Sequence, residues 1–254
     1  MNICVTGGAG FIGSHLVDRL IELGHDVLVI DNLSTGMRSF VHEDAQFIEM
    51  DVRDPKLLSV FEEFKPSIVF HEAAQTMVQS SMENPSYDCD VNLIGLINVL
   101  DACRKVNVEQ FLMPSSAAVY GDLAVLPLTE DLSGMPSSFY GLTKLTAEGY
   151  LRIYHEAFGL NTVCFRYANV YGPRQGDGGE GGVISIFNRL IVEGQPLTVF
   201  GDGEQTRDFI YVDDVVDANI KAMGNGQCTG IYNISTNKGT SVNELITRFR
   251  TISG

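Results

Sequence analysis

A tyrosine and a lysine in the stretch Tyr140-Gly141-Leu142-Thr143-Lys144 have a spacing that suits proton transfer. Residues four apart share one face of a helix, and Ser137 or Ser138 can cap a helix that we expect to run to about residue 158. A phenol is a poor base at its ordinary pKa of about 10, but neighbouring cations stabilise the phenolate and lower that pKa. Such a pair also arises by chance on exposed helices, so it indicates chemistry only together with other features.

One such feature is the glycine-rich turn near the start of the chain, Gly7-Gly8-Ala9-Gly10-Phe11-Ile12-Gly13. A short apolar run precedes it and an amphipathic helical segment follows, which predicts strand, tight turn and helix. Glycines let the backbone turn sharply and approach a pyrophosphate, whose charge the N-terminus of the helix favours. Both the G-x-G-x-x-G and the G-x-x-G-x-x-G register fit, and either alone is a weak signal.

A carboxylate follows at the position where a dinucleotide site needs one. Residues 26–31 read as a second strand that ends in Asp31, eighteen residues past Gly13, where a carboxylate holds a ribose hydroxyl. A glycine-rich turn with an Asp closing a strand is the alternative. The ordered set of strand, glycines, helix, strand and acid favours a dinucleotide, and Asp31 favours NAD over NADP because it would repel a 2′-phosphate.

Strand and helix signals alternate through the first two thirds of the chain. Further strands are expected at 46–50, 67–71, 110–114 and 162–167, and helices at 55–64 and 84–106. This alternation predicts an α/β fold, a doubly wound parallel (Rossmann) sheet, with ligands beyond the carboxyl ends of the strands. Asp51, Ala73 and the hydroxyl of Ser116 fall at that edge. Asp51 could instead cap the helix that follows, and the small residues after 71 could instead serve tight helix–sheet packing.

The last third reads as a substrate lobe, so we divide the chain into residues 1–167 and 168–254, with the lobe partly interleaved with the sheet. Helices are expected at 183–193 and 213–223, a strand at 230–234, and a capping box at Ser241–Glu244. The glycine-rich stretch 176–182 is either a gate over a substrate or a flexible connector. Arg207 is the candidate for gripping a diphosphate, against the alternative of a surface ion pair with Asp208 or Glu204.

Composition excludes several classes of protein. With 254 residues and 44% hydrophobic residues, the chain can bury one large domain or one domain plus a smaller lobe. The net charge of −15, from 32 acidic and 17 basic residues, argues against general nucleic-acid or membrane-surface binding. The 5 cysteines are widely spaced and form no metal-binding motif, which predicts reduced, mostly buried thiols in a cytoplasmic protein without a metal site or membrane span.

Together these motifs resemble the extended short-chain dehydrogenase/reductase family of NAD-dependent nucleotide-sugar epimerases and dehydratases, and within it the UDP-glucose 4-epimerases most. The matching pieces span nearly the whole chain: 6–13, 31–36, 71–75, Asn92, 115–121, 140–144, 166–173 and 201–213.

The resemblance implies a role for each matching residue. Ser116 and Tyr140 would bind the sugar 4-hydroxyl, with Tyr140 as base, and Lys144 would bind the nicotinamide ribose and tune Tyr140. Asn169 would touch the nucleotide diphosphate, beside Arg207. The NAD-binding residues implied are Gly7, Gly10, Phe11, Ile12, Gly13, Asp31, Asn32, Ser34, Thr35, Gly36, Asp51, Val52, Ala73, Ala74, Gln75, Asn92, Tyr140 and Lys144.

The resemblance also implies a reaction. Hydride would leave C4 of a UDP-hexose for NAD, the 4-keto sugar would turn over, and hydride would return to its other face, inverting C4. Related dehydratases carry an Asp-Glu pair directly after the serine, whereas this chain has Ala117-Ala118, which argues against dehydration.

Several alternatives stay open. The substrate could be a UDP-N-acetylhexosamine or a UDP-uronate, or that of another nucleotide-sugar enzyme, and a dinucleotide sensor without catalysis is the alternative from another class. A homodimer is expected through the helices at 85–106 and 138–158. Members of the family usually run several tens of residues past the position of Gly254, so the sequence looks truncated.

Overall fold

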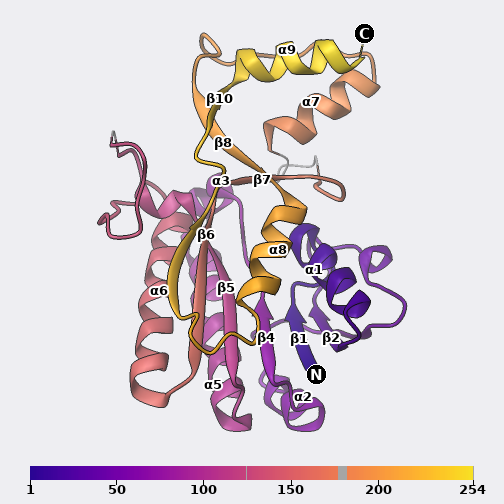
Figure 1. Cartoon of the computed structure of the whole chain (residues 1–254), viewed down its shortest axis with the longest axis vertical. Helices are drawn as coiled ribbons and strands as arrows, with labels where there is room; N and C mark the ends of the chain where they lie inside the picture. The colour runs from indigo at the N-terminus through magenta and orange to yellow at the C-terminus, as the bar shows by residue number, and fades with distance from the viewer. Residues whose placement is uncertain (124, 177–181, 254) are drawn as a thin grey trace.

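A seven-stranded sheet forms the centre of the molecule, with strand order β3-β2-β1-β4-β5-β6-β9 (Figure 1). It is seen in a computed structural model that describes residues 1–123, 125–176 and 182–253. Every pairing in this sheet is parallel, and the order reverses between β1 and β4, which confirms the doubly wound fold. The strands are β1 (Asn2–Thr6), β2 (Asp26–Asp31), β3 (Gln46–Glu49), β4 (Ile68–His71), β5 (Gln110–Ser116), β6 (Asn161–Tyr167) and β9 (Gly230–Ile234).

Helices cover both faces of the sheet. They are α1 (Phe11–Glu22), α2 (Leu57–Phe64), α3 (Val78–Glu83), α4 (Pro85–Cys89), α5 (Leu96–Val106), α6 (Phe139–Phe158), α7 (Val183–Val192), α8 (Val212–Ala222) and α9 (Val242–Ser253), with short turns η1 (Arg38–Phe40), η2 (Asp90–Gly95) and η3 (Ala117–Tyr120).

Each strand supplies alternate side chains to two separate cores. Cys4 in β1 packs toward α2, α5 and α6, whereas its neighbours Ile3 and Val5 pack toward α1 and α8. This period of two explains why the central strands are apolar throughout, since both of their faces are buried.

The expected helix at 84–106 is present but changes its winding. Between α4 and α5 the segment η2 is π-helical, with ordinary helical dihedral angles at both junctions. The wider turn carries Asn92 on its buried side, and such turns are frequent at functional sites. Helix α2 begins at Leu57, two residues later than expected, because Asp54, Pro55 and Lys56 form a turn in which the Asp54 carboxylate accepts from the Lys56 N–H.

Both predicted helix caps are confirmed. The Ser138 hydroxyl accepts a hydrogen bond from the Gly141 N–H at the start of α6. Ser241 and Glu244 bond each other's main-chain N–H groups at 3.1 and 2.9 Å, which completes the capping box of α9.

A smaller lobe stands over the carboxyl ends of the large sheet, at the top of Figure 1. It contains α7, α9 and a three-stranded sheet in the order β10-β8-β7, made of β7 (Asn169–Tyr171), β8 (Thr206–Tyr211) and β10 (Gly239–Ser241). Most of the glycine-rich stretch 176–182 lies outside the described residues, so its role as gate or connector stays a prediction.

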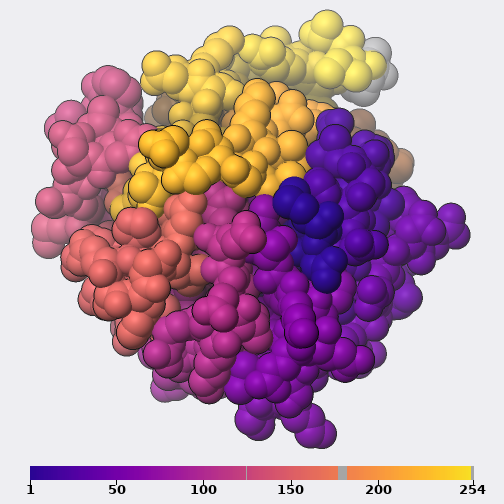
Figure 2. All heavy atoms as spheres, turned by 60° about the horizontal axis from the view of Figure 1, so that its bottom comes forward, coloured from indigo at the N-terminus to yellow at the C-terminus, as the bar shows by residue number. Residues whose placement is uncertain are grey.

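The chain crosses between the two parts more than once. Helix α8 packs on α1, and β9 adds to the edge of the large sheet beside β6. In Figure 2 the gold-coloured segment around β9 lies above the salmon-coloured end of α6 and extends toward the indigo N-terminal residues. Residues after 167 thus contribute to both parts of the molecule. A domain boundary at residue 167 stays a prediction.

No helix among the described residues is long and apolar enough to span a membrane, and these residues contain no cluster of acidic, histidine and cysteine side chains that could hold a metal ion. All cysteines are free: Cys4, Cys103 and Cys164 are buried, whereas Cys89 is exposed. A cytoplasmic location stays a prediction.

Candidate active site

The glycine turn after β1 has no room for a side chain at Gly7 or at Gly13. Gly7 has a φ of +72°, and a Cβ on it would lie 2.5 Å from the Ala73 main-chain nitrogen. A Cβ on Gly13 would lie 2.3 Å from the Gly7 carbonyl oxygen. The turn can therefore exist only with glycine at these positions, and its backbone lies directly against the loop after β4.

Helix α1 starts without a side-chain cap, because its N-cap residue is Gly10. The first N–H groups of a helix, here beginning at Phe11 and Ile12, have no partner inside the helix. Helix α6 differs, since a serine caps it. An uncapped N-terminus behind a glycine turn fits the pyrophosphate of a dinucleotide.

Asp31 lies at the end of β2, as expected, and it also braces the glycine turn. Its Oδ2 accepts from the Ala9 N–H at 3.0 Å and its Oδ1 accepts from the Leu33 N–H at 2.8 Å, with 8% of the residue exposed. Gly36 in the same loop lies against Ala9, since a Cβ there would come within 2.9 Å of it. This carboxylate thus fixes the turn and the loop that carries Ser34 and Thr35.

Asn32 and Asp51 meet at the outer side of this loop. The Asn32 amide donates to Asp51 Oδ2 at 2.8 Å, and the Arg53 guanidinium donates to both Asp51 oxygens. These bonds hold the pKa of Asp51 below its usual range, chiefly through Arg53. Its side chain caps the Arg53 N–H rather than a helix. Val52 is buried in the core, so only its main chain can face a cofactor.

The loop after β4, with Ala73, Ala74 and Gln75, is held by the π-helical turn. Asn92 accepts from the Gln75 N–H at 2.9 Å and donates to the Gln75 carbonyl oxygen at 3.0 Å. Behind it lies Asp88, which is fully buried and accepts hydrogen bonds from the side chains of Gln75, Asn92 and Thr143. Asn92 therefore shapes this wall of the site through Gln75.

Sequence reasoning missed Asp88 and Thr143. Thr143 stands three residues after Tyr140, and this spacing was the available signal, because residues three apart lie on one face of a helix. Asp88 carries no local signal.

Tyr140 is held from both sides of its main chain. Its N–H donates to the hydroxyl of the buried Ser81 at 3.1 Å, and its carbonyl oxygen accepts from the Thr143 hydroxyl at 3.0 Å. Ser116, at the end of β5, faces the phenol closely enough to lower its pKa in part. Burial is the larger effect and raises the pKa of Tyr140 above its ordinary value. The lowered pKa of Tyr140 that the sequence analysis expects therefore stays a prediction for the protein with its cofactor bound.

Lys144 lies behind Tyr140, with its ammonium nitrogen 6.0 Å from the centre of the Tyr140 ring. The ammonium donates to the Pro114 carbonyl oxygen at 3.0 Å, and only 5% of the residue is exposed. Burial lowers the pKa of Lys144, while neighbouring acidic groups act in the other direction. The structure thus brings Ser116, Tyr140 and Lys144 together at one strand end.

A titratable group that the sequence analysis did not single out borders this set. Glu72 follows β4 directly, and among the hydrogen bonds of the described residues its carboxylate has no partner. Burial raises the pKa of Glu72 to about 7, while the positive charge of Lys144 acts against the shift.

This raised pKa predicts a pH-dependent cost to stability. Because the folded state binds the Glu72 proton more tightly than the unfolded state, this contribution to stability is present below pH 4.5 and is lost as pH rises through about 7. Glu72→Gln should therefore raise the free energy of unfolding at pH 8 by roughly 1–3 kcal/mol, and by much less at pH 5. Urea unfolding of the nucleotide-free protein at both pH values tests this, with the exposed Glu62→Gln as control. An equal change at both pH values would contradict the prediction.

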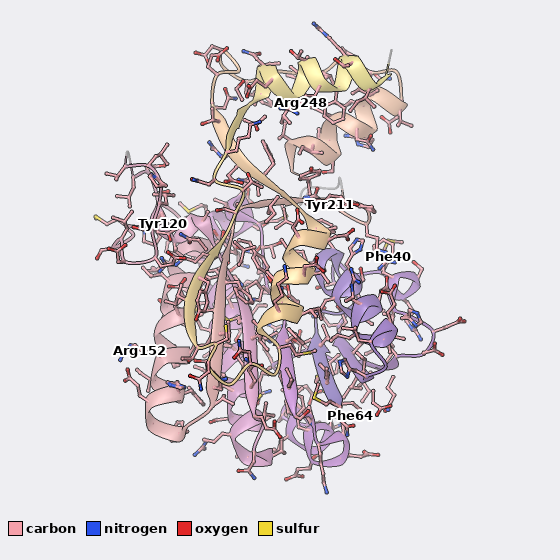
Figure 3. The ribbon with its side chains drawn as sticks, viewed as in Figure 1. Phe40, Phe64, Tyr120, Arg152, Tyr211 and Arg248 are labelled. Atoms are coloured by element: carbon pink, nitrogen blue, oxygen red, sulfur yellow. The ribbon has the colours of Figure 1, made fainter. Side chains whose placement is uncertain are left out.

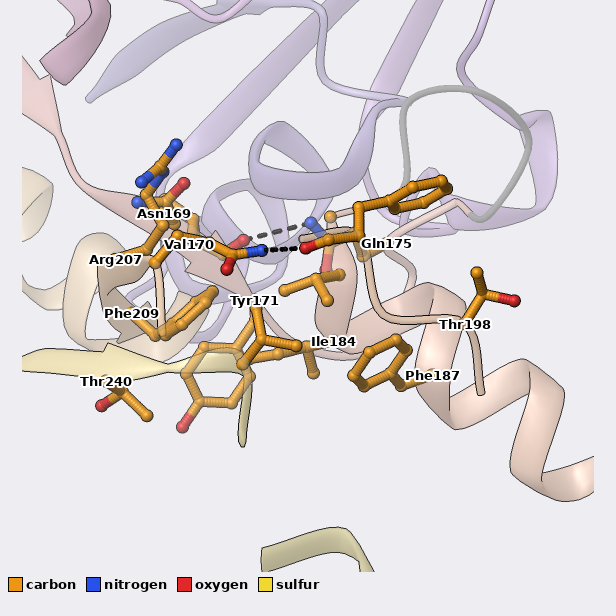
Figure 4. Close-up of a pocket in the computed structure, with 15 residues that line it drawn as sticks. Asn169, Val170, Tyr171, Gln175, Ile184, Phe187, Thr198, Arg207, Phe209 and Thr240 are labelled. Carbon is orange, nitrogen blue, oxygen red and sulfur yellow. Dashed lines mark hydrogen bonds between the residues drawn. The ribbon is translucent and has the colours of Figure 1, made fainter. Parts of the chain in front are cut away.

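Asn169 and Arg207 line one cavity of about 320 Å³ in the lobe, a size suited to part of a small ligand. The Asn169 amide donates a hydrogen bond to the Asp208 carbonyl oxygen. Arg207 is exposed, and it takes part in none of the ion pairs between described residues. Figure 4 shows the Asn169 amide and the Arg207 guanidinium at one side of the cavity, and the Phe187 ring at the other. Tyr171, Phe187 and Phe209 make the remaining wall largely aromatic.

The geometry agrees with a family assignment from sequence. The model of the NAD dependent epimerase/dehydratase family matches residues 3–235. The chain belongs to this family. Its cofactor is NAD, and the glycine turn, the uncapped start of α1 and Asp31 fit that group.

Relatives with known names point the same way. A putative UDP-glucose 4-epimerase of Methanocaldococcus jannaschii is 46% identical, over 96% of this chain and 79% of the relative. The crystal structure of the UDP-glucose 4-epimerase of Thermotoga maritima with UDP-glucose has a TM-score of 0.96 and 43% identity, covering 100% of this chain and 83% of that one. A UDP-N-acetylglucosamine 4-epimerase from Methanobrevibacter ruminantium M1, in complex with UDP-N-acetylmuramic acid, has a TM-score of 0.94 and 36% identity, covering 99% and 81%.

Proposed function

We propose that this protein is an isomerase that inverts C4 of a UDP-hexose, interconverting UDP-glucose and UDP-galactose through a 4-keto sugar. The observation that carries the proposal is the meeting of Ser116, Tyr140 and Lys144 at the end of β5. The names of the similar proteins support it.

The side chains divide the work. Tyr140 removes the proton of the sugar 4-hydroxyl and later returns one, Ser116 holds that hydroxyl toward the phenol, and the Lys144 ammonium stabilises the phenolate. Bound NAD supplies the reversible hydride acceptor. The alanines at 117 and 118 offer no acid–base pair for losing water, which favours epimerisation over dehydration.

A UDP-N-acetylhexosamine or a UDP-uronate is the second candidate substrate. The likeness to a UDP-N-acetylglucosamine 4-epimerase favours it. Purified protein offered UDP-glucose and UDP-N-acetylglucosamine in parallel separates the two. Conversion of UDP-N-acetylglucosamine alone would replace the first proposal by the second. Bound NAD without conversion of either sugar or of a UDP-uronate would favour a sensor.

Arg207 should bind the substrate diphosphate. Arg207→Ala should raise KM for the UDP-sugar roughly tenfold to a hundredfold, the value of one charge-assisted hydrogen bond, and leave kcat within about threefold. Steady-state kinetics test this, with Arg152→Ala as the control variant. Arg152 is an exposed arginine of α6 that pairs with Glu156. An unchanged KM would reject Arg207 as a phosphate ligand.

We also propose that the chain forms a homodimer through α6 and the helical segment of α4, η2 and α5. Leu142 and Ile153 of α6 are 49% and 51% exposed, and their spacing of eleven residues puts them on one face. Ile94 in the neighbouring segment is 53% exposed. Light scattering should give a dimer for the wild type and a monomer for Ile153→Lys. A monomeric wild type would reject the proposal.

A further inference from the structure

The end of β5 is attached to α6 at three successive residues. The Pro114 carbonyl oxygen accepts from the Lys144 ammonium, and Ser116 lies against Tyr140. Between them, the Ser115 hydroxyl donates to Glu148 Oε1 at 2.6 Å. Because Tyr140, Lys144 and Glu148 are spaced by four, they lie on one face of the helix.

Glu148 continues into a buried ion pair with Arg166. The guanidinium donates from Nε to Oε1 at 2.9 Å and from Nη2 to Oε2 at 2.8 Å, with both residues 5% exposed. Arg166 lies opposite Ser115 in the β5–β6 ladder. The same carboxylate is therefore shared by two neighbouring strands and defines how both lie against α6.

The remaining Arg166 nitrogen reaches the segment that leads from β5 to α6. Nη1 donates to the Tyr120 hydroxyl at 2.9 Å and to the Glu130 carbonyl oxygen at 3.2 Å. Tyr120 in turn donates to Asn233 of β9, whose amide holds the Leu128 carbonyl oxygen. Figure 3 places Tyr120 at this segment, above the strands, whereas Arg152 extends from the outer side of α6.

Stability alone does not account for such a pair. Removing two charges from water costs free energy that their attraction often fails to recover, so an apolar pair of similar volume is frequently as stable. What a bidentate pair provides is fixed geometry. Here the Glu148–Arg166 pair fixes the positions of Pro114 and Ser116, on either side of Ser115. It also fixes the part of α6 one turn away from it, which carries Lys144.

We infer that Glu148 and Arg166 are positioning residues, which hold the Ser116 hydroxyl and the Lys144 ammonium in register with the Tyr140 phenol. The inference rests on the proposed function, because the register serves proton transfer at Tyr140.

The first test is Glu148→Gln, which keeps the shape of the side chain and an acceptor for Ser115 but loses the charge. We expect kcat to fall roughly tenfold to a hundredfold, with KM within threefold and NAD retained. Because the Glu148 charge raises the pKa of Lys144, the basic limb of the kcat–pH profile should move to lower pH. Glu156→Gln, which breaks the exposed Arg152–Glu156 pair on the same helix, should match the wild type. A folded Glu148→Gln protein with wild-type kcat and an unshifted profile overturns the inference.

The second test separates positioning from folding. In the double variant Glu148→Met with Arg166→Met, the thermal midpoint should return close to the wild-type value while kcat stays at least tenfold low. Recovery of both overturns the inference. If these variants do not fold, Ser115→Ala provides a milder test, because it removes only the hydrogen bond from Ser115 to Glu148. This variant should lower kcat several-fold. A wild-type kcat in Ser115→Ala also overturns the inference. A wild type that converts no UDP-sugar would instead count against the proposed function.

Discussion

Replacing Tyr140 by phenylalanine should lower turnover by about 10²–10⁴-fold, the range attributed to general acid–base catalysis. The change removes one oxygen atom and leaves the ring, the Ser81 contact to the main chain and the Lys144 position in place. We propose that NAD is held mainly by the glycine turn and the loops after β2 and β4, so the variant should purify with the same amount of nucleotide.

The measurement combines an epimerase assay with release of the bound nucleotide by denaturation. Tyr150→Phe is the matched control, since Tyr150 is 36% exposed and lies ten residues, about 15 Å, further along the same helix. Turnover of Tyr140→Phe equal to that of the control would exclude Tyr140 as the base. Loss of the nucleotide would show that the phenol oxygen serves binding.

Gly7→Ala should abolish retention of NAD and destabilise the protein. The left-handed backbone at Gly7 costs an alanine about 1–2 kcal/mol. The new Cβ would also lie 2.5 Å from the Ala73 nitrogen, so the loop of residues 72–75 has to move. We propose that this loop and the glycine turn line the same cofactor site, so displacement of the loop should weaken the binding of NAD.

Gly226→Ala is the control for this change, because a Cβ at Gly226 has no atom within 4 Å. It should keep the nucleotide and the thermal midpoint of the wild type, whereas Gly7→Ala should lose several degrees. A Gly7→Ala protein that purifies with a full complement of NAD would show that the turn tolerates a side chain, and would remove the main structural support for the cofactor site.

The sequence predicted those parts of the molecule that depend on local patterns. Apolar strands, the glycine turn and the serine cap of α6 all follow from neighbouring residues, and the structure has them within about two residues. The π-helical turn at Asn92 was not predicted, because residues 84–106 carry a continuous helical pattern and the wider winding becomes visible only through the bonds to Gln75.

Buried polar groups were the other part that the sequence did not reveal. Asp88 and Glu148 look like ordinary surface carboxylates of amphipathic helices, yet each is buried and receives several hydrogen bonds from other elements. Their partners lie on other elements of the chain: Thr143 is 55 residues from Asp88, and Arg166 is 18 residues from Glu148. The local sequence gives no reason to expect a buried carboxylate at either position. Burying a charge is favourable only when hydrogen-bond donors or opposite charges from other elements converge on it.

The late addition of β9 has a consequence for biosynthesis. Strand β6 (Asn161–Tyr167) pairs with β5 on one side, but its other edge stays unsatisfied until Gly230–Ile234 have left the ribosome. A nascent chain in which Ser116, Tyr140 and Lys144 are already synthesised therefore still displays a bare, apolar strand edge, which can recruit strands from other chains. Translation arrest or proteolysis just before residue 230 should yield aggregates rather than a nucleotide-binding fragment.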